Sequence, residues 1–229
     1  RKAGITVCLK NLVGINGDKS WIAHHRRGID EYPVLRFGEW LRWHSGAFLK
    51  NHAPPLETGA AYNVYRVLFL GGRTVKEHTL QTGGPLMEGS WHGNETEWRT
   101  ILDLNNIVFY ADKEGVLHTD RQRSYLAVGD GIVGMDREGP VAGTPNIAGV
   151  IAAGLHPVAV DAGVCRLMGF DCRYRPSLRH AFEVPFCGLT QLDPEEIRTT
   201  GICDSAALAF SPPSGWRNHI ELPQVPNDE

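Results

Sequence analysis

Acidic side chains and glycines are concentrated in residues 129–140, GDGIVGMDREGP, which contain Asp130, Asp136 and Glu138. Neighbouring carboxylates can hold a divalent cation, or raise the pKa of one of them until it carries a proton near neutral pH. The stretch therefore predicts general acid–base chemistry or a metal site, with Asp130 and Asp136 as the expected metal ligands. A turn-rich connection with solvated acids is the alternative that the pattern leaves open.

Two more charged residues lie in apolar surroundings. Lys10 follows an apolar N-terminal segment, and Asp161 stands between Val160 and Ala162. A buried lysine needs an anionic partner, and a carboxylate near a helix N-terminus is either bonded to backbone amides or directed at a ligand. We predict catalytic roles for Lys10, Asp130 and Asp161. Lys10 would hold an anion, Asp130 would be a base or metal ligand, and Asp161 would be a second acid.

A basic cluster at residues 24–27, HHRR, suits anion binding through charge-assisted hydrogen bonds. Basic groups facing acidic ones across a common hollow predict a site for a small anionic substrate. A solvated basic loop without a role is the alternative. The expected substrate-binding residues are Asn11, Asp18, Lys19, His24, His25, Arg26, Gly131 and Gly139.

Apolar segments on both sides of the acidic stretch must position these residues. Residues 125–128 lead into it and residues 147–153 follow it, both typical of buried strands. His156-Pro157 begins a helix that continues through residues 158–168, because proline fits the first turn. Residues 1–15 fit a strand or a helix. We predict an α/β fold with a mixed or mostly parallel sheet flanked by helices, and a site at the carboxyl ends of its strands.

Other segments predict an insertion and a tail. Residues 32–52 and 58–70 carry aromatics at helical spacing, and we expect an aromatic helical insertion at about residues 30–115 of a single domain, residues 1–210. Asn94 and Glu97 indicate the start of a helix that ends near Tyr110. Short helices are expected at 178–182 and 194–199. Residues 211–229 are proline-rich and predict a surface extension.

Composition excludes several classes of protein. A net charge of −3 argues against general nucleic-acid binding, and no apolar run reaches the ~20 residues that span a bilayer. None of the 5 cysteines shows C-x-x-C spacing, so we expect no iron–sulfur cluster in this chain and reduced thiols of a cytoplasmic protein. The chain opens without methionine, and we interpret it as a fragment.

Three segments carry a resemblance to known proteins: residues 3–21, AGITVCLKNLVGINGDKSW, residues 129–145, GDGIVGMDREGPVAGTP, and residues 156–171, HPVAVDAGVCRLMGFD. Together they resemble the DUF362 family of uncharacterised proteins. The resemblance covers about residues 1–28 and 125–182. It implies an α/β fold, with an N-terminal half of the family domain missing from this chain. The sequence departs from the family pattern at His156, where an aspartate is common, and at Arg137, which could neutralise Asp136.

Two functions remain in view. The first is an enzyme with a polar site that acts on a small anionic substrate, with a divalent metal as the expected cofactor. The alternative is a non-catalytic binding or accessory protein, whose aromatic helices carrying Trp40, Trp43 and Phe48 would contact a protein partner or a carbohydrate.

Overall fold

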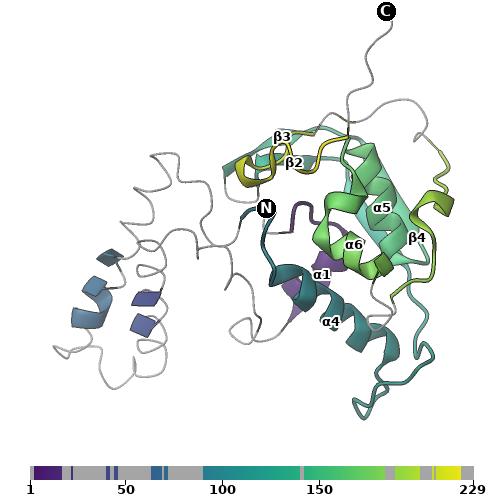
Figure 1. Ribbon diagram of the computed structural model, residues 1–229, viewed down its shortest axis with the longest axis horizontal. Coiled ribbons are helices and arrows are strands. Elements are labelled where there is room, and N and C mark those ends of the chain that lie inside the picture. Colours follow the sequence, from purple (N-terminus) through teal and green to yellow (C-terminus); the bar gives the residue numbers. More distant parts are fainter. Residues whose placement is uncertain are drawn as a thin grey trace, which may run out of the picture. The chain divides into compact units, whose positions relative to one another are not determined.

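The structure is a computed structural model of the chain and divides into two compact units, Arg1–His25 with Ser90–Glu229, and Arg26–Gly89 (Figure 1). It describes residues 3–16, 22, 40, 41, 44, 45, 63–68, 70, 71, 90–139, 142–183, 189–201, 208 and 210–222. In the second unit, residues 63–68 are helical, while the rest of the two predicted aromatic helices lies mostly outside the described residues. The helix ending at Tyr110 belongs to the first unit, although the predicted insertion had included it.

Four α-helices of the first unit pack together. They are α1 (Cys8–Ile15), α4 (Glu97–Tyr110), α5 (Pro157–Leu167) and α6 (Pro176–Glu183). α1 contacts both α4 and α5, and α4 contacts α6. The buried residues of α4, among them Ile101, Leu102 and Phe109, recur at helical spacing, so one face of this helix enters the core. None of the helices in the described ranges is long and apolar enough to cross a lipid bilayer.

Three helices predicted from the sequence are confirmed, α4, α5 and α6. α4 and α5 occupy the expected positions, and α5 ends before Gly169, whose φ of 82° suits glycine. A short 3₁₀ helix, η3 (Pro194–Glu196), begins after Asp193, whose side chain accepts a hydrogen bond from the Glu195 amide. For residues 1–15, which fitted a strand or a helix, the structure shows the helix α1.

Four strands form two small antiparallel sheets. β1 (Ala127–Gly131) pairs with β4 (Val150–Gly154), and β2 (Gly134–Glu138) pairs with β3 (Ala142–Asn146). In sequence order, the hairpin of β2 and β3 thus lies between β1 and β4, which pair directly with each other. The mixed α/β class is confirmed, but the described strands show no parallel pairing.

The acidic stretch 129–140 is largely strand, where a loop had been predicted. β1 and β2 take up most of it, and residues 132–133 connect them. Its glycines allow close pairing, because a Cβ at Gly131 would lie 3.0 Å from the Val150 carbonyl oxygen. The prediction of a loop failed because β2 has no apolar alternation of the kind that marks a strand.

The C-terminal residues enter the core. Trp216, at the end of the 3₁₀ helix η5 (Ser214–Trp216), is 0% exposed, and Ile220 is 1% exposed. The Asp171 amide donates to the Ile220 carbonyl at 2.7 Å, and the Leu222 amide donates to the Gly169 carbonyl at 3.0 Å. The prediction of a surface extension is therefore wrong for residues 211–222. These residues are held in the core by single apolar side chains, which do not recur at the regular spacing of a helix or strand.

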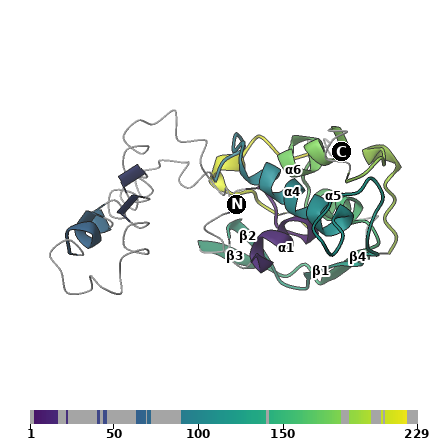
Figure 2. The same ribbon diagram turned by 90° about the horizontal axis from the view of Figure 1, so that it is seen from below.

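The helices cover one face of the β1–β4 sheet. Ala127 of β1 is buried in a cluster with Cys8 of α1 and Val160 of α5. Figure 2 shows β1 and β4 along one side of the helical layer formed by α1, α4 and α5. This part of the first unit therefore has two layers, with helices on one side of the β1–β4 sheet.

Candidate functional site

Asp161 binds the N-terminus of α1 from a position in α5. Its Oδ1 accepts hydrogen bonds from the amides of Cys8 at 2.8 Å and Leu9 at 3.3 Å. These amides are among the donors that a helix leaves unsatisfied at its start, and they carry the positive end of its dipole. Asp161 is 0% exposed. The predicted contact of this carboxylate with backbone amides is thus present, but the amides belong to a helix distant in sequence.

Arg175 completes the surroundings of Asp161. Its Nη1 lies 3.3 Å from Asp161 Oδ2, and both side chains are fully buried. The guanidinium also donates to the carbonyls of Ala3 at 3.2 Å and Ile5 at 3.0 Å. Burial raises the pKa of the Asp161 carboxyl, while Arg175 and the two amides act in the opposite direction. The pair joins the N-terminal segment to α5 and to the residue preceding α6.

Lys10 forms a second buried ion pair, with Glu97 at the start of α4. The Lys10 Nζ to Glu97 Oε1 distance is 3.4 Å, and the two side chains are 14% and 1% exposed. Burial lowers the pKa of the Lys10 ammonium, Glu97 opposes this, and Arg175 adds to it. The lysine thus has the anionic partner that its apolar surroundings required.

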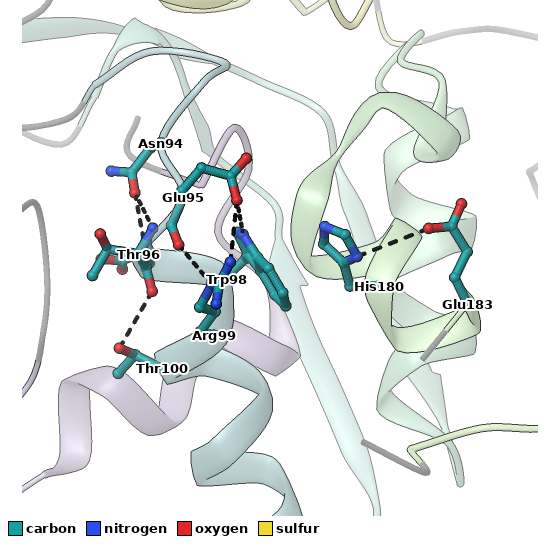
Figure 3. A network of polar contacts seen from close by, with 9 residues as sticks. Asn94, Glu95, Thr96, Trp98, Arg99, Thr100, His180 and Glu183 are labelled. Atoms are coloured by element: carbon teal, nitrogen blue, oxygen red, sulfur yellow. Dashed lines mark hydrogen bonds and ion pairs between the residues drawn. The ribbon is translucent and has the colours of Figure 1, made fainter. Parts of the chain in front are cut away.

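The start of α4 holds Glu97 in place. Asn94 Oδ1 accepts hydrogen bonds from the amides of Thr96 at 2.9 Å and Glu97 at 3.1 Å, as Figure 3 shows. The Asn94 side chain thus satisfies amides at the start of α4, and the helix begins at Glu97, as the sequence predicted. On the outer side of the same turn, Trp98 stacks on His180 of α6 with ring centroids 3.8 Å apart.

Asp130 is separate from both buried pairs. It is exposed on β1, and its Oδ1 accepts a hydrogen bond from the Ile132 amide at 3.0 Å. Within the described part of the chain, no hydrogen bond or ion pair joins any two of Lys10, Asp130 and Asp161. The catalytic roles predicted for these three residues remain predictions.

Asp136 and Glu138 connect the β2–β3 hairpin to the C-terminal segment. Asp136 Oδ1 accepts hydrogen bonds from the amides of Arg137 at 2.9 Å and Ser211 at 2.6 Å, and Glu138 Oε1 accepts one from the Ser214 amide at 2.6 Å. The described residues contain no group of three His, Cys, Asp or Glu side chains placed to hold a metal ion. The metal-binding role of Asp130 and Asp136 is still a prediction.

An open surface depression of about 330 Å³, called the cavity below, lies where the hairpin meets the C-terminal segment. It is lined by Arg137, Ser211, Pro212, Arg217, Asn218 and Glu221. Arg137 and Asn218 are the two described non-glycine residues in the left-handed region, with φ of 56° and 63°. Such conformations cost of order 1–3 kcal/mol and gather at ligand-binding sites. Both strained residues thus lie at one cavity.

Charge in this cavity is predominantly positive. The structure shows no hydrogen bond or ion pair from the guanidinium of Arg137 or Arg217 to any described residue. Desolvation acts to raise the pKa of Glu221, but backbone N–H groups, those of Asn218 and Ile220 among them, lower it overall. Its carboxylate is therefore occupied by amides, while the guanidiniums of Arg137 and Arg217, two of the lining residues, have no partner among the described residues. This arrangement can hold an anion.

The other predicted substrate-binding residues are scattered or outside the described residues. Asn11 is exposed on α1, Gly131 ends β1, and Gly139 follows β2. Asp18, Lys19, His24, His25 and Arg26 lie outside the residues that the structure describes.

Sequence reasoning missed Arg175, Arg217 and Glu221 as site residues. Arg175 stands directly before Pro176, the first residue of α6, and this position was its one local signal. Arg217 and Glu221 had no signal, because they lie in the segment interpreted as a surface extension. Arg137 had been noticed only as a neighbour that could neutralise Asp136.

Comparison with known proteins places the chain in a family. The family profile of DUF362, described as a domain of unknown function, matches residues 1–166. Comparison with curated proteins and with solved structures gave no significant match. The match contains α1, the acidic stretch, both sheets and almost all of α5, and it ends before Arg175 and the C-terminal wall of the cavity. Because it covers well over half of the sequence, the chain belongs to the DUF362 family.

Proposed function

We propose that this protein binds a small anionic molecule, with a carboxylate or phosphate group, in the cavity between the β2–β3 hairpin and residues 211–221. The single observation that carries the proposal is that Arg137 and Arg217, whose guanidiniums have no partner among the described residues, both line one cavity of about 330 Å³. That volume lies at the lower end of the range for small-molecule sites, ~300–1,000 Å³. Planar guanidiniums are suited to bidentate bonds with either group.

The two walls of the cavity are fixed relative to each other. The Arg137 amide donates to the Ser211 carbonyl at 3.1 Å, and the Ser211 amide donates to Asp136 Oδ1 at 2.6 Å. Because these bonds hold the hairpin against the C-terminal segment, the ligand would not have to order both walls on binding. Asp136 then has a positioning role here, which is different from the metal-ligand role predicted from the sequence.

We also propose that the protein acts as an enzyme on the anion bound in this cavity. The strain at Arg137 and Asn218 is typical of functional sites, and Glu221 would be the carboxylate nearest to a bound anion among the cavity residues. The acid–base assignment of Lys10, Asp130 and Asp161 is a different hypothesis, since none of the three lines this cavity.

Calorimetric titration with inorganic phosphate and with succinate tests the proposal. We expect saturable binding that weakens as salt is added, and a loss of about tenfold or more in Arg217→Gln. Arg198→Gln is the matched control, because Arg198 is exposed and does not line the cavity. Absence of binding to both probes, or an equal loss in the control, would overturn the proposal.

Replacements of Arg137 separate binding from folding. Arg137→Ala and Arg137→Gly both remove the guanidinium, so both should weaken phosphate binding. Glycine also relieves the left-handed φ of 56°, so Arg137→Gly should be at least as stable to thermal unfolding as Arg137→Ala. Retained binding in both variants would contradict a role of this side chain.

One observation favours the accessory alternative as a second candidate. Trp40 of the unit Arg26–Gly89 is 56% exposed, and its ring lies 4.6 Å from that of His44. Exposed tryptophan is enriched at protein interfaces. Trp43 and Phe48 lie outside the described residues. If this surface binds a partner or a carbohydrate, Trp40→Ala should abolish that binding and leave phosphate binding at the cavity unchanged.

A further inference from the structure

The β1–β4 sheet has one apolar face that no described helix covers. Cross-strand pairs place Val128 opposite Ala153 and Asp130 opposite Ile151, and Leu126 and Leu155 extend the same alternation by one step at the end of the sheet. We name these six positions the open face. The opposite face, represented by Ala127, is buried against α1 and α5. Successive residues of a strand point to opposite sides, so the open face is directed away from the helices.

The open face is strongly exposed. Its four large aliphatic side chains, Leu126, Val128, Ile151 and Leu155, are 58–76% exposed, and Asp130 is its single charged residue. The connections at one end of the sheet add three more exposed aliphatic side chains, those of Ile132, Val133 and Ile147. An antiparallel sheet that faces water on one side normally alternates apolar and polar residues, with the polar ones outward. The outward positions here are apolar instead.

The size of this surface indicates what covers it. Aliphatic side chains of this kind present on the order of 100 Å² of apolar surface each, so the seven at this exposure offer on the order of 500 Å². Ala153 and Asp130 are exposed as well, so the patch approaches the ~600 Å² per partner at the lower end of the standard interface size. The patch is therefore large enough to be one subunit's share of a small dimer interface.

We propose that the open face is the interface of a homodimer, in which the β1–β4 sheets of two copies stack face to face. Aligned sheets pack about 10 Å apart with interdigitated side chains, and the outer helical layers would then cover both sides of the stacked sheets. A two-fold axis brings the same patch of both copies together, so apolar rows meet apolar rows. The two Asp130 carboxylates, which lie toward one end of the sheet, belong at the rim of this contact.

Sedimentation velocity of the 229-residue chain over a concentration series tests the proposal. We expect twice the monomer mass for the wild type. Val128→Lys should weaken association at least tenfold, because Val128 pairs with Ala153 in the apolar part of the open face and the lysine places a charge there on both subunits. Val116→Lys is the matched control, since Val116 is a 57% exposed aliphatic residue outside the open face, and it should leave the dimer unchanged.

Circular dichroism and thermal unfolding establish that each variant folds. If Val128→Lys does not fold, Val128→Thr keeps a β-branched side chain in the strand and should still weaken the dimer. A monomeric wild type at every concentration would overturn the proposal, as would a dimer that Val128→Lys and Val128→Thr leave intact. Open-ended aggregation would also overturn the proposal. So would co-sedimentation of a monomeric protein with neutral lipid vesicles, because the open face would then bind lipid and not a second copy.

Discussion

The carboxylate of Asp161 and the guanidinium of Arg175 lie 3.3 Å apart with both side chains fully inaccessible to solvent. Each partner also binds backbone atoms of the N-terminal segment, Asp161 at the start of α1 and Arg175 at Ala3 and Ile5. Removing either charge therefore leaves the other buried together with unsatisfied backbone groups. This pair fixes where residues 3–9 attach to the core.

Asp161→Asn should destabilise the protein strongly. Asparagine can still accept a bond from an α1 amide, but it leaves the buried Arg175 charge uncompensated, which costs about 3–5 kcal/mol in comparable sites. Urea unfolding, followed by circular dichroism, measures the loss. Glu183→Gln is the control, because the Arg179–Glu183 pair is half exposed and contributes little. A small change in Asp161→Asn would mean that Arg175 finds another partner.

The sequence indicated which buried charged residues require an oppositely charged partner, but it did not indicate which residues those partners are. Lys10 and Asp161 were recognisable because each lay among apolar residues, and such groups require compensation. Glu97 is distant in the chain from Lys10, and Arg175 lies 14 residues after Asp161, beyond the end of α5. Only the tertiary contacts among α1, α4 and α5 determine which charge meets which.

The helices were predictable because their signals are local, whereas the sheets were not. A proline at the first turn and a glycine after the last one delimit α5 within the sequence itself. Parallel or antiparallel pairing depends on long-range contacts that apolar runs do not encode. Trp216 shows the same limit, because a single side chain filled a core position without any periodic pattern around it.

Lys10→Met should also destabilise the protein, and a second change should recover much of the loss. The single variant leaves the carboxylate of Glu97, which is 1% exposed, without the ammonium 3.4 Å away. Adding Glu97→Gln removes the charge that has lost this ammonium, so the double variant should be more stable than Lys10→Met alone. Additive losses in urea unfolding would contradict a direct energetic coupling between the two residues.

Trp216→Ala should unfold the C-terminal segment from the core. The side chain is 0% exposed, and replacing a buried aromatic by alanine costs about 3–5 kcal/mol. Because residues 211–221 form one wall of the cavity, phosphate binding should weaken in parallel. Hydrogen exchange of the Ile220 carbonyl's partner, the Asp171 amide, reports the detachment directly. An unchanged melting temperature would show that the tryptophan is dispensable.

Lowering the pH below 6.5 should destabilise the protein through His156. Arg121 Nη2 donates to His156 Nε2 at 2.8 Å, so this imidazole is neutral with its proton on Nδ1. Burial, and then Arg121, lower the pKa of His156, while the Leu189 carbonyl opposes them. The unfolded chain therefore takes up its proton near 6.5, before the folded protein does. Between that value and the lower folded pKa the unfolded state binds more protons, so the free energy of unfolding falls as the pH falls.

Urea unfolding at a series of pH values above and below 6.5 checks this sign. In His156→Gln the fall should be smaller, because glutamine does not titrate. Arg121→Gln should also reduce it, since the cation that disfavours the imidazolium is gone. Burial and Arg179 lower the pKa of His180 as well, so a residual fall of the same sign is expected in both variants. A pH profile of His156→Gln that runs parallel to the wild type would mean that the folded protein accommodates the imidazolium at no cost.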